Sequence, residues 1–439
     1  MVSTDYFMIH ASTASRRILL ASIGTYGDVF PFLSLGKKLL ARGHDVTLLT
    51  SGYFKDLVEG AGLKIAAVGT AEQYQAYVSN PHLVHPIRGL LLTAQVLHSV
   101  LEPVYEYIRD EWQTDNSIVV ASPYCIGARI AQETFNIRLV TVALAPLAMG
   151  STLDPPAITA LVTSRNIPKS FRSHFGTGVH WVTDQVIGRP VNKLRRKLGL
   201  KRMHKLLQWW HSPAASISLF PEWFAPPSAD WPINHTFAGF PTTSSSNEFN
   251  SDNAALDQFL SMGRPTIVFY PGSNASHVKH YFSVCAQVCD RMGCQGVFVA
   301  PAAIDLGNFS APQVHIASFV PMDRTLRSAQ AVVHHGGSGT IVDCFKAGVP
   351  QLIRPMFGDQ YDNASRVSQL GVGSWLSNSQ FRLPKVVSEL EKLLNSDSVA
   401  TQCLHFQKRT KESDGLATAA DIIEAFPVEG GSRTTSRAL

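Results

Sequence analysis

The chain has 439 residues, which is too long for one ordinary hydrophobic core and predicts two or three domains. Hydrophobic residues make up 45% and charged residues 16% of the chain, a globular composition that is slightly poor in charge. The net charge of +5 is small, and no basic patch is interleaved with aromatic residues, so we expect no nucleic-acid partner.

The cysteine pattern and the apolar runs indicate where in the cell we expect the protein. None of the six cysteines forms a CxxC pair or has the His/Cys spacing of a metal site, so we expect reduced thiols and no metal. Met1–Ser15 lacks the continuous apolar core of a signal peptide, and the longest apolar run, Leu90–Leu97, is far shorter than the roughly 18 residues of a membrane span. We therefore expect a cytoplasmic protein, at most peripheral to the inner face of the membrane. No feature indicates an oligomeric state.

The first half reads as a doubly wound domain over residues 17–241, preceded by a flexible N-terminus at 1–16. Short apolar runs alternate with helical patterns, which predicts a parallel sheet buried on both faces. Gly24–Asp28 is expected to form a turn, Pro31 to lie in the first turn of the following helix, and Gly43 to end that helix. The expected elements are strands at 17–23, 45–50, 63–68, 118–121, 139–143 and 216–220, and helical segments at 31–43, 53–61, 87–108 and 126–135, with a long insertion at 144–211.

A polar stretch, TTSSSNEFNSDN at 242–253, is the clearest domain boundary and is predicted to be a linker. The α/β rhythm then restarts over a second domain at 254–427, before a tail at 428–439 that is expected to be disordered. The predicted elements are strands at 266–269, 297–300, 314–317, 331–333 and 351–355, and helices at 255–262, 280–292, from 341 to about 348, at 383–394 and within 399–425. We expect two Rossmann-like domains that face each other across a cleft, with ligands at the carboxyl ends of the strands.

The stretch Val332–Val367 carries the strongest chemical signal. A short apolar strand runs into Gly336–Thr340 and then into a helical pattern, which leaves unpaired backbone N–H groups where a phosphate can bind. His335 and the hydroxyls of Ser338 and Thr340 add donors for the same anion. Asp359 and Gln360 follow the next apolar strand and suit the hydroxyls of a sugar. Since the turn is neither GxGxxG nor GxSxG, a dinucleotide cofactor and a nucleophile elbow are disfavoured.

These motifs resemble the nucleotide-sugar-dependent glycosyltransferases of GT-B fold, which include the UDP-glycosyltransferases and the antibiotic, sterol and rhamnolipid transferases. The resemblance rests on HGGSGT at 335–340, AGVP at 347–350 and DQYDNA at 359–364, together with GTYGDV at 24–29 and RGHDV at 42–46. More narrowly, GDVFPF at 27–32, EPVYEY at 102–107 and LFPEWFAPPSADWP at 219–232 are similar to the bacterial rhamnosyltransferases that make rhamnolipids.

The resemblance implies a set of donor contacts. The diphosphate would be held by His335, Gly337, Ser338, Gly339 and Thr340, with Ser273 as a second phosphate contact and Thr25 as a further donor-binding residue. The sugar hydroxyls would bind Asp359 and Gln360. The base would stack on Phe319 and meet the backbone near Val320 and Met322; because the plant members' Trp and Gln are absent there, uracil and thymine both remain open.

Asp28 is the candidate catalytic base. Displacement at an anomeric carbon needs a group that accepts the acceptor's proton, and the resemblance places Asp28 in that role, with inversion of configuration and no metal or cofactor beyond the nucleotide sugar. Without the resemblance, an aspartate before a helix is more often an N-terminal cap.

The acceptor side is less defined. The basic, amphipathic segment Asn192–His211 is predicted to be a solvated helix packed on the first domain, and a membrane surface is the alternative. Apolar residues in 83–104 and 143–161 are compatible with a hydrophobic acceptor, although core packing explains them equally.

The sequence thus predicts transfer of a rhamnose-like deoxyhexose or of glucose from a UDP or dTDP sugar to a hydroxyl of a lipid-like acceptor. A UDP-glucose enzyme acting on a sterol, polyketide or carotenoid is the main alternative. A nucleotide-sugar epimerase and a non-catalytic auxiliary protein are the alternatives from other classes.

Overall fold

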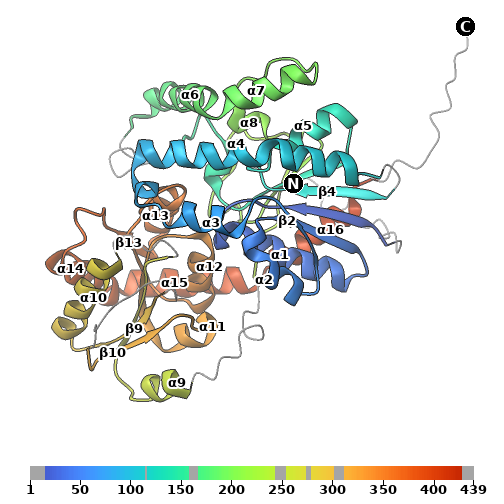
Figure 1. Ribbon diagram of the computed structural model, residues 1–439. Coiled ribbons are helices and arrows are strands. Elements are labelled where there is room, and N and C mark those ends of the chain that lie inside the picture. Colours follow the sequence, from blue (N-terminus) through green and yellow to red (C-terminus); the bar gives the residue numbers. More distant parts are fainter. Residues whose placement is uncertain are drawn as a thin grey trace, which may run out of the picture.

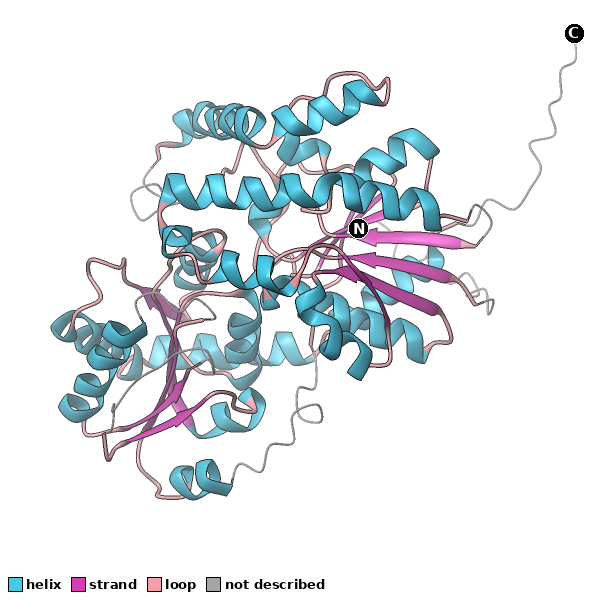
Figure 2. Ribbon diagram, in the orientation of Figure 1, coloured by secondary structure: helices cyan, strands magenta, loops and turns pink. Residues whose placement is uncertain are grey.

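The two halves of the chain form two α/β domains, each built on one parallel sheet (Figures 1 and 2). A computed structural model describes residues 15–113, 116–157, 167–242, 254–272, 278–300 and 311–427. The expected N-terminus, most of the expected linker and the expected tail lie outside the described residues, apart from 15–16 and 242. The predicted fold class, two Rossmann-like doubly wound domains of GT-B type, is confirmed.

The N-terminal sheet has seven parallel strands in the order β3-β2-β1-β4-β5-β6-β7. The strands are β1 Arg17–Ala21, β2 Asp45–Thr50, β3 Lys64–Ala67, β4 Ser117–Ala121, β5 Leu139–Ala143, β6 Ala215–Ser218 and β7 His235–Phe237. Side chains alternate between its faces: Leu19 and Ala21 enter one hydrophobic core, and Ile18 and Leu20 enter the other. Because helices cover both faces, the central strands β1, β4 and β5 are nearly continuous apolar runs.

The helices of the first half include one that starts earlier than predicted. They are α1 Tyr26–Ala41, α2 Lys55–Gly60, α3 Ala71–Val78, α4 Pro86–Glu111, α5 Ile126–Phe135, α6 Lys169–Val186, α7 Gly188–Lys197 and α8 Leu206–Trp209, with 3-10 turns at Gly52–Phe54, Pro81–Val84 and Pro146–Met149. Pro31 lies inside α1 and not in its first turn, so that prediction was wrong. The helix begins at Tyr26 because Thr25 and Asp28 close a capping box there.

The expected single helix over 192–211 is two short helices, α7 and α8, joined by a bend. Gly199 and Lys205 both have positive φ, at 72° and 54°, which breaks the helix between them. Val191, Leu194 and Leu206 are buried in the core beside the sheet, so the segment packs on the N-terminal domain. Figure 1 shows α6 and α7 side by side above α4.

The C-terminal sheet has six parallel strands in the order β10-β9-β8-β11-β12-β13. The strands are β8 Thr266–Tyr270, β9 Gln295–Val299, β10 Val314–Ala317, β11 Ala329–His334, β12 Gln351–Ile353 and β13 Gly373–Trp375. The helices are α9 Ala254–Leu260, α10 Val278–Met292, α11 Met322–Thr325, α12 Ser338–Ala347, α13 Gln360–Gln369, α14 Leu383–Leu394, α15 Asp397–Lys411 and α16 Gly415–Ala425, with a 3-10 turn at Leu326–Ser328. The strand predicted to reach residue 355 ends at Ile353, and the predicted turn at Gly358–Gln360 leads directly into α13.

The last helix, α16, packs on the N-terminal domain (Figure 1). Its Leu416, Ala419, Ala420 and Ile423 are buried in the same core as Ile18 and Leu20 of β1. Arg42 at the end of α1 reinforces this contact, because its guanidinium donates to Asp421 at 2.7 Å and to Glu424 at 2.6 Å. The chain therefore crosses from the C-terminal domain back to the N-terminal domain before it reaches residue 427.

Candidate active site

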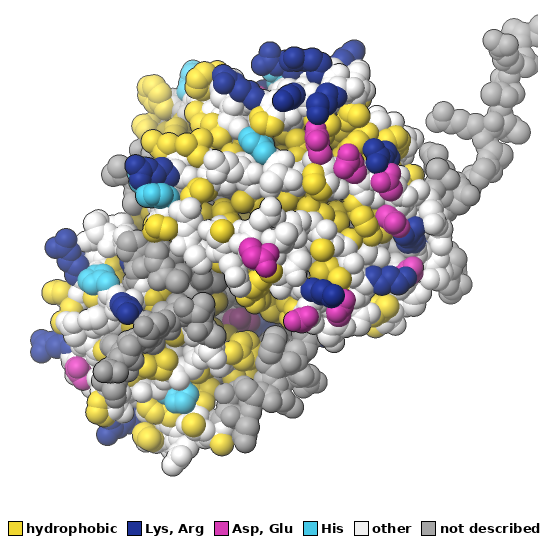
Figure 3. Space-filling view, viewed as in Figure 1, with side chains coloured by type: hydrophobic (Ala, Val, Ile, Leu, Met, Phe, Trp, Pro, Cys, Tyr) yellow, Lys and Arg dark blue, Asp and Glu magenta, His cyan; other side chains and the backbone are white. Residues whose placement is uncertain are grey.

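The two strongest candidate groups lie where the strand order of each sheet reverses. Asp28 follows β1, which lies between β2 and β4, and His335 follows β11, which lies beside β8. Open α/β sheets bind ligands at such switch points, outside the carboxyl ends of the strands. Figure 3 shows a hollow between the two domains, with acidic side-chain atoms visible at its floor. The geometry thus brings the predicted base and the predicted phosphate site to one cleft.

Asp28 is held in place by its own helix start. Its Oδ2 accepts the backbone N–H of Thr25 at 2.7 Å and the Thr25 hydroxyl at 3.1 Å, and its backbone carbonyl accepts the Ser22 hydroxyl at 2.8 Å. A Cβ on Gly24, whose φ is +148°, would lie 2.2 Å from Oδ2, so only glycine fits there. The capping interpretation is therefore correct in geometry, yet both bonds go to Oδ2, and Oδ1 remains for a substrate.

The surroundings of Asp28 favour its use as a base. Part of the side chain is accessible to solvent, but the carboxylate lies deep in the cleft with protein atoms dense around it, and this burial raises its pKa. The two hydrogen bonds from Thr25 act in the opposite direction. A carboxylate with a raised pKa holds an abstracted proton better than an exposed one does.

The two adjacent histidines have different roles. His334 is fully buried; its Nδ1 accepts the N–H of Gly336 at 3.1 Å, and its Nε2 lies 3.1 Å from Oε1 of Gln351 on β12. Because Nδ1 accepts, Nε2 carries the proton and donates to Gln351. Burial lowers the pKa of His334 to about 3, so it stays neutral. His334 shapes the glycine turn, a role that the sequence interpretation missed.

His335 lies between two glycines. A Cβ on Gly337 would come 2.5 Å from its Nε2, and a Cβ on Gly272, at the end of β8, would come 2.9 Å from its ring carbons. Burial lowers the pKa of His335 to about 4, so the imidazole is neutral and donates one N–H at neutral pH. Its Nδ1 is buried and has no hydrogen-bond partner among the described residues. The Tyr270 backbone also acts on the ring and raises its pKa against the effect of burial, and Nε2 is the ring nitrogen that lies toward Gly337.

The start of α12 supplies the other donors for an anion. Gly337 is the cap residue, and its carbonyl accepts the N–H of Ile341 at 3.1 Å. The amides of Ser338, Gly339 and Thr340 precede this first helical bond and have no partner within the helix. Gly339 is exposed, and a Cβ placed on it would meet nothing within 4 Å. These amides and the positive end of the helix suit a diphosphate.

Asp359 and Gln360 lie beside this helix start, but they are not equally available. Asp359 Oδ2 accepts the Ser338 hydroxyl at 3.3 Å and Nδ2 of Asn363 at 2.9 Å. Oε1 of Gln360 accepts the backbone N–H groups of Met356 at 2.8 Å and Phe357 at 3.3 Å, so this oxygen braces the loop that precedes α13. Asp359 Oδ1 and the Gln360 amide N–H₂ are therefore the atoms left for sugar hydroxyls.

Asn363 joins the two parts of the site and was missed as a site residue. Its Nδ2 donates to the Gly336 carbonyl at 3.0 Å and to Asp359 Oδ2 at 2.9 Å, linking the glycine turn to the candidate sugar contact. Its sequence signal was the fourth position after Asp359, the spacing of one helical turn. Burial and, as the second cause, the charge of Asp28 together raise the pKa of Asp359 to about 6, against the hydrogen bonds from Asn363 and Ser338.

The predicted base contacts lie along the approach to α11. Phe319 is partly exposed, Val320 is buried in the core beneath it, and Met322 begins α11. Val320 can therefore meet a ligand only through its backbone. Asp343 lies on the following helix, α12; burial and the charge of Asp323, against that of Lys346, raise its pKa to about 7. Ser273 lies outside the described residues.

Two family models match this chain, one in each domain. The N-terminal domain of glycosyltransferase family 28 matches residues 18–148, and the C-terminal domain of the erythromycin biosynthesis protein CIII-like family matches residues 299–412. The chain belongs to the GT-B glycosyltransferases. Asp28 thus lies within the first match, and His335, Asp359 and Asn363 lie within the second.

Similar glycosyltransferases occur in fungi and bacteria. A sterol 3-beta-glucosyltransferase of Debaryomyces hansenii is 26% identical over 94% of this chain, which spans only 27% of that longer protein. An uncharacterized glycosyltransferase of Mycobacterium tuberculosis is 24% identical and is matched over 93% of this chain and 98% of its own length.

Solved structures share the fold of the whole chain. The kitacinnamycin glycosyltransferase has a TM-score of 0.72 at 18% identity, covering 94% of this chain and 100% of its own. A spinosyn rhamnosyltransferase complexed with thymidine diphosphate has a TM-score of 0.65 at 18% identity, covering 92% of this chain and 99% of its own. At this level of identity the likeness shows the fold.

Proposed function

We propose that this chain transfers a hexose or deoxyhexose from a nucleoside-diphosphate sugar to a hydroxyl of a hydrophobic acceptor, with inversion at the anomeric carbon. The observation that carries the proposal is the pairing of Asp28 with the His335 turn at two facing switch points, with Asp359 beside them. One domain offers a base, and the other offers donors for a leaving diphosphate. Few other reactions need both groups in one cleft.

In the proposed reaction the acceptor oxygen attacks the anomeric carbon while Oδ1 of Asp28 accepts its proton. The bond from that carbon to the diphosphate breaks, and its electron pair stays on the diphosphate oxygen. The amides of Ser338, Gly339 and Thr340 and the N–H of neutral His335 stabilise the charge that develops there. These donors act without a metal ion, and no cofactor other than the nucleotide sugar is proposed.

For the donor and the acceptor we propose classes of compound and not single molecules. The thymidine diphosphate in a spinosyn rhamnosyltransferase of the same fold favours a dTDP sugar, such as a rhamnose-like deoxyhexose. The sterol 3-beta-glucosyltransferase relatives favour instead glucose and a sterol-like acceptor, which is the second candidate. Both candidates share a flat or elongated hydrophobic acceptor. We propose a cytoplasmic enzyme, and among the described helices none has the length and apolarity needed to cross a bilayer.

The test is a thermal-shift series with UDP, TDP and their glucose and rhamnose conjugates, followed by product analysis with a hydroxylated hydrophobic acceptor. A ligand that binds only the native state raises the melting temperature. We expect one diphosphate to raise it clearly and the matching sugar conjugate to support transfer. If no nucleotide shifts the melting temperature, the proposal is wrong. Interconversion of the sugar donor without acceptor would instead identify an epimerase, and nucleotide binding without transfer would identify an auxiliary protein.

A further inference from the structure

Helix α6 presents apolar side chains to solvent. Phe171 is 63% exposed, Trp181 is 65% exposed and Val182 is 40% exposed. They occupy positions i, i+10 and i+11 and so lie on one side of the helix. The other exposed side chains of α6 that the structure describes are Ser170, His174 and Thr177, so none of them is Lys, Arg, Asp or Glu. A surface helix normally carries polar residues on its outer face, so an aromatic outer face needs an apolar partner.

The next helix, α7, and the bend after it present a basic surface. Between Asp184 and Glu222 the sequence contains no Asp or Glu. The exposed basic side chains are those of Arg189, Lys193, Arg196, Lys197, Lys201, Arg202 and Lys205. Lys197 pairs with Glu102 at 3.0 Å. Figure 3 shows Lys and Arg atoms gathered over α7 at the top of the molecule, beside hydrophobic atoms over α6.

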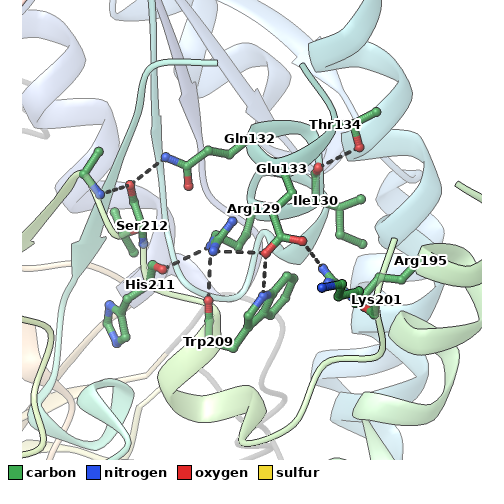
Figure 4. Close-up of polar contacts among 12 residues, drawn as sticks. Arg129, Ile130, Gln132, Glu133, Thr134, Arg195, Lys201, Trp209, His211 and Ser212 are labelled. Atoms are coloured by element: carbon green, nitrogen blue, oxygen red, sulfur yellow. Dashed lines mark hydrogen bonds and ion pairs between the residues drawn. The ribbon is translucent and has the colours of Figure 1, made fainter. Parts of the chain in front are cut away.

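One basic residue of α7 points inward and fixes this surface to the domain (Figure 4). Arg195 is 5% exposed; it pairs with Glu133 of α5 and donates to the Lys201 carbonyl at 2.7 Å. Glu133 also accepts Nε1 of Trp209 at 2.8 Å, and the Trp209 ring lies between Arg195 and Arg129, with guanidinium-to-ring distances of 4.7 and 5.1 Å. These contacts attach α7 and the bend to α5, and the other basic side chains of this segment are exposed.

The inner face of α6 connects this surface to the cleft. A Cβ on Gly176 would come 2.4 Å from the Thr152 carbonyl oxygen, and Nε2 of His180 lies 2.8 Å from the Gly150 carbonyl, so α6 packs tightly on this loop. Further along the same loop, the backbone N–H of Ala157 donates to Oδ1 of Asp362 on α13 at 3.2 Å. The aromatic outer face of α6 thus lies on the opposite side of this helix from a loop that reaches the candidate donor site.

We propose that the outer faces of α6 and α7 dock on an anionic lipid bilayer. Phe171, Trp181 and Val182 would enter the headgroup and upper acyl region, and the α7 side chains would contact acidic headgroups. The apolar side chains of α6 match the acyl region of a bilayer. The adjacent cationic segment, which contains no carboxylate, matches its acidic headgroups. The docking itself does not depend on catalysis. Its benefit to the enzyme, which is access to an acceptor dissolved in the membrane, rests on the proposed function.

The test is co-sedimentation of the full chain with vesicles of phosphatidylcholine alone or mixed with phosphatidylglycerol. We expect binding to the anionic vesicles that weakens as salt is raised. Trp181→Asp with Phe171→Asp, and separately Lys193→Glu with Arg196→Glu, should each weaken partitioning about tenfold or more. The matched controls, Leu404→Asp and Lys408→Glu on α15, change side chains that are 62% and 80% exposed and should bind as wild type does.

Several results would overturn the docking surface. These are no binding of wild type to anionic vesicles, equal binding by the α6 and α7 variants, or loss on charge reversal alone with the Trp181/Phe171 variant unaffected. The last result would indicate a polyanion site instead of a bilayer. Melting temperatures with and without UDP and TDP separate the two proposals, because all four variants should keep the nucleotide shift. A wild type that binds vesicles but shows no nucleotide shift would contradict only the proposed function.

Discussion

The charge of Asp28, on the first turn of α1, raises the pKa of Asp359, which lies just before α13 in the other domain. Two carboxylates from different domains therefore share one electrostatic environment at the floor of the cleft. Each is held by donors of its own domain, Asp28 by Thr25 and Asp359 by Asn363. With Asp28 as the base and Asp359 as a sugar contact, substitutions of the two carboxylates should have different effects.

Asp28→Asn should lower kcat by about 10²- to 10⁴-fold, because the amide cannot accept the proton of the acceptor. The amide oxygen can still accept from Thr25, so the melting temperature and the affinity for the nucleotide should change little. Asp28→Ala should lose the same activity and also about 1 kcal/mol of stability, because the capping box is lost.

The matched control for Asp28 is Gln73→Ala. Gln73 closes a similar capping box at α3, where its Oε1 accepts the N–H of Thr70 at 2.9 Å. This variant should show the stability loss without the loss of kcat. Transfer at the wild-type rate by Asp28→Asn would show that another group takes the proton.

Gly337→Ala should weaken nucleotide binding about tenfold or more, because the new Cβ would lie 2.5 Å from Nε2 of His335 and displace the imidazole. Gly272→Ala should also weaken binding, because its Cβ would lie 2.9 Å from the His335 ring carbons and its φ of +88° is unfavourable for alanine. Gly60→Ala on α2 is the control, since a Cβ there meets nothing within 4 Å. Titration calorimetry with UDP or TDP measures the difference, and unchanged affinity in both variants would remove His335 from the phosphate site.

Asn363→Ala should raise the KM for the nucleotide sugar and cost about 1–3 kcal/mol of stability, because the Gly336 carbonyl and Asp359 lose a buried donor. Gln407→Ala is the control at the other end of α12, where Nε2 of Gln407 donates to the carbonyls of Lys346 and Ala347 at 3.2 and 2.8 Å. That variant should lose stability with no change in KM. An equal rise of KM in both variants would mean that Asn363 acts only through the stability of α12.

Asp359→Asn should stabilise the protein above about pH 6 and have no such effect below about pH 4. The pKa of Asp359 is raised from 3.8 to about 6, so between these values the folded protein keeps a proton that the unfolded chain has released. The free energy of unfolding of the wild type therefore falls as pH rises through this window, by at most about 3 kcal/mol for two pKa units. Denaturant titrations at pH 4 and pH 8 measure the difference.

In the same experiment, Asp230→Asn should change the free energy of unfolding in the opposite direction. Burial would raise the pKa of Asp230, but hydrogen bonds from Ser151, Ser228 and Thr152 prevail and lower it to about 2. Its contribution to stability is present above the ordinary value of 3.8 and is lost as pH falls toward 2, so this substitution should destabilise the protein at pH 8. The same sign for both substitutions at pH 8 would contradict the assigned environments.

Much of the architecture follows from the sequence because apolar runs bounded by glycine, proline or polar residues leave little choice. The bounds predicted at 45–50, 126–135, 139–143, 314–317 and 383–394 are those of β2, α5, β5, β10 and α14. The strands β7 and β13 were not predicted, because three residues at a sheet edge carry too short a pattern to distinguish them from loop.

Part of the candidate site was likewise predictable from the sequence, and part was not. Residues of the glycine turn come together because they are adjacent in sequence, and Asp359 joins them because β11 and β12 are neighbours. The roles of His334 and Asn363 were not predictable, since an imidazole or an amide reveals its partners only when distant backbone groups are folded against it. The exposed face of α6 was not predicted either: it lies within the long insertion at 144–211, and the exposure of Trp181 and Val182 is known only once the packing of the helix is known.

The return of α16 to the N-terminal domain has a consequence for folding during synthesis. The core around Ile18 and Leu20 includes Leu416 and Ile423, which leave the ribosome only after the whole C-terminal domain has been made. The first domain to be synthesised is therefore the last to complete its core, and until then the α1 face that contacts α16 is uncovered. A fragment ending at residue 241 should expose that face and aggregate unless a peptide spanning 414–427 is supplied to cover it.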